Sequence, residues 1–307
     1  MDNAVVSGAV PDVGTPRGAA LEGLSPRELA ARHGLGQSGA RPSLLAYMRQ
    51  LWRRRHFIVA FATSKTVAMY TTARLGQLWQ VLTPLLNAAV YYLIFGLLLN
   101  TSRGVGDYFI AFLVTGIFVF NFTQRSVLVG SRAISDNLGL IRALHFPRAA
   151  LPLSLTLVEL QQLLMSMLVL AAIVLTTGEP LTWSWLLVVP ALLLQTLFNV
   201  GLCLAIARFG AKISDVSQTL PFLLRFWQYG SGVFYSITHF TASAPQWVQI
   251  MLKANPGAVY IDLVRDALIK DYQVDPVIWL YGVGWAVLVS AAGFVYFWKA
   301  EETYGRG

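Results

Sequence analysis

Charged side chains are scarce in this chain. Asp, Glu, Lys and Arg make up 12% of its 307 residues, whereas soluble domains carry about a quarter. Apolar residues make up 56%, and many of them lie in long runs. This composition argues against a soluble enzyme and indicates that lipid is the solvent. The net charge of +8 does not indicate nucleic acid, because the basic residues lie in the short gaps between apolar runs.

Cysteine and histidine are also rare, and several chemistries are excluded with them. Cys203 is the single cysteine and lies in an apolar run, so we expect it to pack as a small hydrophobe, with no disulfide or thiolate metal site. The four histidines are scattered and show no metal-ligand spacing. Neither a phosphate-binding G-x-x-x-x-G-K-[ST] loop nor an H-E-x-x-H motif is present. Any energy for uphill transport must therefore come from another subunit.

Six apolar segments approach the roughly 20 residues that a helix needs to cross about 30 Å of hydrocarbon. We therefore expect an all-α integral membrane protein with six transmembrane helices. Gly230 and Gly232 interrupt the fifth segment, and the second segment is short. The expected spans are residues 78–99, 108–124, 149–176, 183–207, 218–237 and 277–298.

The basic residues fall mostly on one side of these segments. Eighteen of the 23 Lys and Arg lie on the side of the two termini, four lie on the opposite side, and Arg225 lies inside a span. By the positive-inside rule both termini are cytoplasmic, which agrees with an even number of helices. Residues 1–40 are rich in Gly, Ala, Pro and Ser, and we expect them to form a disordered cytosolic tail.

Residues 43–59 place apolar side chains at helical spacing, with basic side chains on the other faces. This pattern is typical of a helix that lies in the membrane interface with its basic side toward the headgroups. A cytosolic helix packed on a partner is the alternative. The residues that we assign to this interface helix are Leu44, Met48, Trp52, Arg53 and Arg54.

Residues 242–275, on the expected outer side, contain two apolar segments that are too short to span a membrane. A break at Asn255–Gly257 separates them, and we expect re-entrant or surface helices. Asp262 and Asp266 lie four residues apart, but they alternate with Arg265 and Lys270. The alternation favours a solvated charged face over an acid–base pair.

Three motifs stand beside the expected spans: LGQLWQVLTP from Leu75, LIRALHFPRAALPL from Leu140, and Asn255-Pro256 with Tyr260 and Arg265 downstream. Together they resemble the ABC-2-type permeases that export polysaccharides such as O-antigen, teichoic acid, capsule and galactan. The first motif is similar to the start of the first span in that family. The second is similar to the family's cytoplasmic coupling helix, and the third to the outer segment before the last span.

The resemblance implies that residues 41–307 form a permease domain that is a transport subunit and not an enzyme. It implies a homodimer, two separate ATPase subunits that bind ATP and Mg, and a polyprenyl-lipid-linked glycan as cargo in a bacterial cytoplasmic membrane. No cofactor is expected in this chain. Phe146-Pro147 could instead simply end one helix and begin another. The residues assigned to ATPase coupling are Ile141, Arg142, Leu144, His145, Phe146, Pro147 and Arg148.

Glu159 and Arg225 fall roughly 10–15 Å deep in the third and fifth expected spans. An ionised side chain near the bilayer centre costs at least about 2.5–3.5 kcal/mol, so we expect the two to pair or to line a wet path near Gln161 or Gln162. A shallow vestibule is the alternative. Sugar rings stack on aromatic side chains, and the aromatic candidates for a channel lining, which could instead face lipid, are Tyr91, Tyr92, Phe112, Phe118, Phe226, Trp227 and Tyr235.

Other functions remain open at this stage. An ABC permease for lipids or drugs would share the same architecture. A membrane-embedded glycosyl- or acyltransferase would need a catalytic acid near a membrane surface, and Glu159 is the strong intramembrane candidate. A structural anchor would not need charged residues inside its spans.

Overall fold

The computed structural model describes residues 42–71, 73–94, 108–144, 146–213, 215–241, 243–270 and 272–304. Within these ranges every regular element is a helix and no strand occurs, as the composition predicts. The expected N-terminal tail lies outside the described residues. The helices are α2 (Leu44–Arg53), α3 (Arg55–Thr71), α4 (Trp79–Tyr91), α5 (Phe109–Ser131), α6 (Leu138–Ala143), α7 (Ala150–Thr176), α8 (Val188–Lys212), α9 (Val216–Gly230), α10 (Ile237–Phe240), α11 (Gln246–Lys253), α12 (Pro256–Leu268) and α13 (Val277–Trp298), with 3₁₀ turns η1 (Gly76–Leu78), η4 (Ser135–Asn137), η5 (Trp183–Leu187) and η6 (Glu301–Thr303).

Among the described residues, four helices are long and apolar enough to cross a membrane: α5, α7, η5 with α8, and α13. They correspond to the second, third, fourth and sixth expected spans. α5 continues seven residues beyond the expected end at residue 124. α4 covers the start of the first expected span, whose end lies outside the described residues. α9 stops at Gly230, well before the expected end at residue 237, because Gly232 turns the chain with a φ of +64°.

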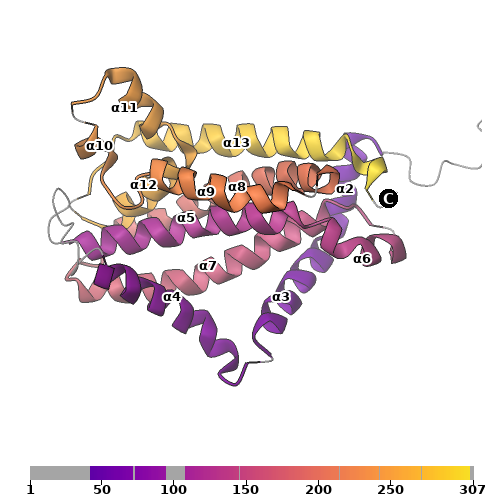
Figure 1. Cartoon of the computed structure of the whole chain (residues 1–307), viewed down its shortest axis with the longest axis horizontal. Coiled ribbons are helices and arrows are strands. Elements are labelled where there is room, and N and C mark those ends of the chain that lie inside the picture. The colour runs from indigo at the N-terminus through magenta and orange to yellow at the C-terminus, as the bar shows by residue number, and fades with distance from the viewer. Residues whose placement is uncertain are drawn as a thin grey trace, which may run out of the picture. The chain divides into compact units, whose positions relative to one another are not determined.

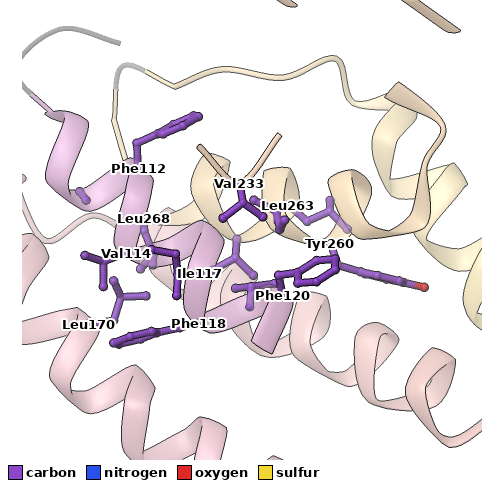
Figure 2. Close-up of a cluster of buried hydrophobic side chains, with 14 of the residues drawn as sticks. Phe112, Val114, Ile117, Phe118, Phe120, Leu170, Val233, Tyr260, Leu263 and Leu268 are labelled. Carbon is purple, nitrogen blue, oxygen red and sulfur yellow. The ribbon is translucent and has the colours of Figure 1, made fainter. Parts of the chain in front are cut away.

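α5 forms the centre of the packed core, and most of its side chains are buried. It lies against α7, α8 and α12, as Figure 1 shows. Figure 2 shows Ile117 and Phe120 of α5 near Leu263 and Tyr260 of α12. The core therefore joins α12, which is too short to span a membrane, to three of the long helices.

α8 and α13 are in backbone contact at two glycines. A Cβ added to Gly201 of α8 would collide with the backbone of Val289 and Ser290, and one added to Gly293 of α13 would collide with Gly201 itself. Small residues at such crossings let helices approach closely in a membrane. These two helices therefore form a tightly fitted pair.

The expected interface helix over residues 43–59 is two helices in the structure. α2 begins with Ser43 accepting a hydrogen bond from the Ala46 N–H, and a turn at Arg54 separates it from α3. Tyr47 and Leu51 face the protein interior. The side chains expected to face the membrane surface, including Met48, Trp52, Arg53 and Arg54, are exposed, whereas Leu44 is half-buried.

The solvated charged face expected on α12 is wrong for Arg265, because this side chain is fully buried. Asn255 caps α12 by accepting a bond from the Gly257 N–H, and Pro256 stands at the first turn, where its missing N–H costs nothing. The Arg265 guanidinium donates to backbone carbonyls of Gly232 and Val233 as well as to Asp262. It thereby ties α12 to the loop that follows α9.

Candidate functional site

A polar cleft lies among α3, α4, α5 and α7, inside the part of the chain that is otherwise apolar. Two phenylalanines, Phe118 and Phe122, form part of its wall. Most of the other side chains carry amides, hydroxyls or charges, which are expensive in hydrocarbon unless they meet each other, water or a ligand. The polar lining residues are Tyr70, Gln80, Thr83, Asn87, Asn121, Arg125, Glu159, Gln162 and Ser166.

Hydrogen bonds between helices hold this cleft together. Arg125 of α5 donates to Gln162 of α7 at 2.9 Å. One residue earlier on α7, Gln161 accepts from Thr66 of α3 at 2.7 Å and donates to Thr63 at 3.2 Å. Amide side chains of α7 thus bond to both neighbouring helices, which fixes the walls of the cleft.

Glu159 is buried at the inner end of this cleft, nine residues into α7 and so about 14 Å along it. Its Oε2 has no hydrogen-bond partner among the described residues. Arg125 and Lys65 are the cations whose charges act on the carboxylate. An ionisable group with a free oxygen in such a place is typical of a wet path through a membrane protein.

A second cleft, of mixed polar and apolar lining, shares Glu159 and extends toward the end of α5. It is also lined by Lys65 of α3, by Arg132, which ends α5, and by Asp136 and Asn137 of η4. η4 leads directly into α6. The two clefts therefore run from the α6 end of the bundle to the middle of α7, and apolar side chains such as Leu155 and Val158 make up about half of the second one.

The structure does not bring Glu159 and Arg225 together. Arg225 is exposed on α9, and the described residues contain no ion pair between the two. Glu159 instead shares the cleft with Arg125, which follows directly after the expected end of the second span at residue 124. Gln162 does lie in the same cleft as Glu159, as expected.

The aromatic candidates for a channel lining separate into three groups. Phe118 lines the cleft. Phe112 and Trp227 are internal, with Phe112 against Arg265 and Trp227 donating to Asn255 at 2.7 Å. The others lie on α4, on α9 or in the loop after it: Tyr91 packs on Phe234, Tyr235 bonds to the Tyr229 carbonyl, and Tyr92 and Phe226 are exposed.

The expected coupling segment begins in α6 and ends at the start of α7. Ile141 and Pro147 are buried, whereas Arg142 and Leu144 are exposed. Phe146 does not project outward, because its ring packs on Phe57 of α3 with 5.4 Å between the centroids. His145 lies outside the described residues.

Arg148 completes this segment and leads to a residue that the sequence analysis did not single out. The Arg148 backbone N–H donates to Glu301 Oε1 at 2.9 Å, and Tyr47 of α2 donates to Glu301 Oε2 at 2.7 Å. Burial raises the pKa of the Glu301 carboxyl above its usual value, although these donors oppose the shift. No sequence signal points to Glu301, because its partners lie 153 and 254 residues away.

The cleft contains other polar residues that the sequence analysis missed, and for these a signal does exist. Gln80, Thr83 and Asn87 follow each other at intervals of three and four residues, so they share one face of α4. Asn121 and Arg125 are four residues apart on α5. A polar stripe of this kind on an apolar helix indicates a face turned away from lipid.

Comparison with known proteins gives one family and several relatives. The family model described as ABC-2 type transporter matches residues 57–269. The O-antigen export system permease protein RfbA of Myxococcus xanthus is 24% identical over 262 residues, which cover 84% of this chain and 98% of that protein. A Klebsiella pneumoniae protein of the same name is 23% identical over 253 residues, or 81% and 93% of the two chains. The family match contains both clefts and the coupling segment, and Glu301 lies beyond it.

Proposed function

The chain belongs to the ABC-2 type transporter family, and from this premise we propose that it is the membrane subunit of an ATP-driven polysaccharide exporter. The names of the two relatives support a cargo of the O-antigen class. We assign a polyprenyl lipid as the carrier of that glycan. The chain itself is a transport subunit, and the hydrolytic chemistry belongs to its partner.

The polar cleft is the observation that supports a glycan as cargo. Sugars offer hydroxyl groups that both donate and accept, and side-chain amides such as Asn87, Asn121 and Gln162 answer both roles. Phe118 and Phe122 add flat apolar surface beside these amides. A permease for purely apolar lipids or drugs would gain nothing from so many amides, and pockets for such cargo are lined mainly by apolar side chains.

The partners follow from the same proposal. A separate ATPase binds ATP and Mg and docks on the segment from Ile141 to Arg148. A second copy of the chain completes the channel, and the exposed faces of α4 and α9 carry apolar side chains suited to this contact, such as Leu86 and Phe226. α4 and α9 then bring the number of spans to six, and α11 and α12 are re-entrant helices.

The membrane is the bacterial cytoplasmic membrane, with both termini on its inner side. The excess of Lys and Arg on the side of the termini supports this orientation. The exposed apolar residues of α2, including Met48 and Trp52, support its place in the inner interface, with Arg53 and Arg54 near anionic headgroups.

Two substitutions in the cleft test the assignment of the cargo path. Asn121→Leu and Thr83→Val keep side-chain size and remove hydrogen-bonding groups that face the cleft. Each should lower glycan export in cells about fivefold, because a lost polar contact is worth about 1 kcal/mol. Surface glycan is measured by antibody or lectin binding, and the amount of inserted permease and of copurified ATPase is measured in parallel.

Thr196→Val is the matched control for Thr83→Val. The Thr196 hydroxyl bonds to the Leu192 carbonyl of its own helix, α8, and lines neither cleft. Export should be unchanged in this variant. Full export in both cleft variants would place the cargo path elsewhere, and a permease that purifies without any ATPase would contradict the exporter itself.

A further inference from the structure

The two residues before α7 are held by distant parts of the chain. The first N–H groups of α7 itself bond to carbonyls of the turn before it, and Ala149 offers no side-chain cap. The Arg148 N–H instead donates to Glu301 Oε1 at 2.9 Å, and the Ala149 N–H donates to the Tyr47 hydroxyl at 3.0 Å. The two residues that lead into this membrane helix are therefore held by α2 and η6.

Glu301 is the centre of this arrangement. Its second carboxylate oxygen accepts from Tyr47 at 2.7 Å, and the Arg148 guanidinium both lies 4.0 Å from the carboxylate and donates to the Glu301 carbonyl. Glu301 and Tyr47 are both buried. The Glu301 carboxylate also lies near the start of α7, the positive end of the helix dipole, where a negative charge is favourable. These interactions favour a rigid contact between Glu301 and the start of α7.

The contact around Glu301 lies between the docking segment and the polar cleft. Arg148 is the last residue of the segment on which we place the ATPase, and α7 carries Glu159 and Gln162 into the polar cleft. When the docking segment moves, the cleft residues of α7 move with it only if the start of α7 is held rigidly to that segment. Glu301 fixes that start to α2 and to the C-terminal segment.

We propose that Glu301 is a positioning residue that couples the docked ATPase to the cleft through α7. The proposal rests on the proposed function, since it needs an ATPase partner and an exported glycan. Glu301 neither binds the cargo nor touches the nucleotide. It holds the coupling segment and α7 in fixed register, with Tyr47 as the second member of the contact.

The test uses the full complex in vesicles, with ATP hydrolysis and glycan export measured on the same preparation. Glu301→Ala should leave the ATPase bound and the KM for ATP unchanged, while glycan exported per ATP falls about tenfold, the effect of losing one to two buried hydrogen bonds. Glu301→Gln keeps an accepting amide oxygen and should give an intermediate ratio. Asp275→Asn, at an exposed carboxylate before the opposite end of α13, should match the wild type.

The ratio of export to hydrolysis separates coupling from stability. A purely structural role for Glu301 would lower the amount of complex, and with it export and hydrolysis together, so the ratio would stay at the wild-type value and overturn the proposal. Tyr47→Phe removes one hydroxyl and serves if Glu301→Ala fails to fold, and an unchanged ratio in Tyr47→Phe would likewise count against it. A wild-type complex without ATP-dependent export would instead contradict the proposed function.

Discussion

At the scale of single residues, Arg265 shows how a buried charge can hold a membrane protein together. Its guanidinium donates to the backbone carbonyls of Phe112, Gly232 and Val233 at 3.0–3.1 Å. The cation also lies 3.3 Å from the ring centroid of Phe112. One side chain thus serves three segments that approach each other only in the folded protein, and its planar fork is what makes this geometry feasible.

Arg265→Lys should destabilise the permease, although it keeps the positive charge. A lysine ammonium cannot reach three carbonyls in the same fork, and each buried acceptor left without a donor costs about 1–3 kcal/mol. The apparent midpoint of thermal unfolding in detergent should fall clearly below that of the wild type. Arg225→Lys is the matched control, because Arg225 is exposed on α9, and its midpoint should not change. Equal midpoints for the two variants would show that the Arg265 contacts contribute little.

At the scale of elements, the coupling segment presents one apolar side chain outward and withdraws another. Leu144 is half exposed at the end of α6, whereas Phe146 packs on Phe57. Exposed apolar side chains next to a basic rim are typical anchors for a partner protein. The structure therefore favours Leu144 as the anchor and Phe146 as a support that fixes the segment to α3.

Leu144→Ala should weaken binding of the ATPase without unfolding the permease. Truncating a buried interface anchor commonly costs about 2 kcal/mol, which weakens a complex roughly thirtyfold. Copurification of the ATPase at low concentration measures this loss. Leu181→Ala is the control, because Leu181 is also an exposed leucine, but lies between α7 and η5. Normal copurification with Leu144→Ala would place the contact elsewhere, for example near Arg208 or on α2.

The elements that the sequence predicts well are those whose length alone decides the outcome. Runs of about 20 apolar residues identify α5, α7, α8 and α13 because no other structure satisfies their backbone in lipid. The end of α5 was missed, since Gln124 and Arg125 read as a boundary until α7 supplies Gln162 as a partner. α3 was missed for a similar reason, because its polar side chains Thr63 and Thr66 bond to Gln161.

The candidate site also contains residues that the sequence predicts and residues that only the packing of helices brings together. A carboxylate inside an apolar run is visible in the sequence, and Glu159 does lie in the cleft. Its cationic neighbours were not predictable, because Lys65 and Arg125 become neighbours only when α3 and α5 pack on α7. Arg265 was misread as solvated, because the spacing of charges along a helix does not say which face is covered.

At the scale of the whole membrane domain, the elements sort to the two ends of α13. α11 and α12 contact its beginning, where Trp285 donates to the Ala254 carbonyl and Tyr260 to that of Gly282. α2 contacts its end, where Tyr47 packs on Phe294. The short helices α10 and α11 therefore lie at the opposite end of α13 from α2, as Figure 1 also shows.

Thiol labelling in intact cells should report these two ends as the two sides of the membrane. Cys203 is buried, so new cysteines can be read against a low background after Cys203→Ser. Cysteines at Ala244 and Gln273 should react with an impermeant reagent, and cysteines at Ser135 and Glu302 should react only after the cells are opened. The reverse labelling pattern would show the opposite orientation in the membrane and place the coupling segment outside the cell.

The backbone contact at Gly201 and Gly293 also has a practical meaning for anyone who wishes to follow this protein at work. Two helices whose backbones touch cannot slide or rotate against each other without a clash. We therefore expect α8 and α13 to move as one rigid pair throughout a transport cycle. Distances measured between a spectroscopic label on α8 and one on α13 should stay constant. The rigid pair is therefore a fixed frame of reference, and motion of α3, α4, α7 or α9 can be measured relative to it.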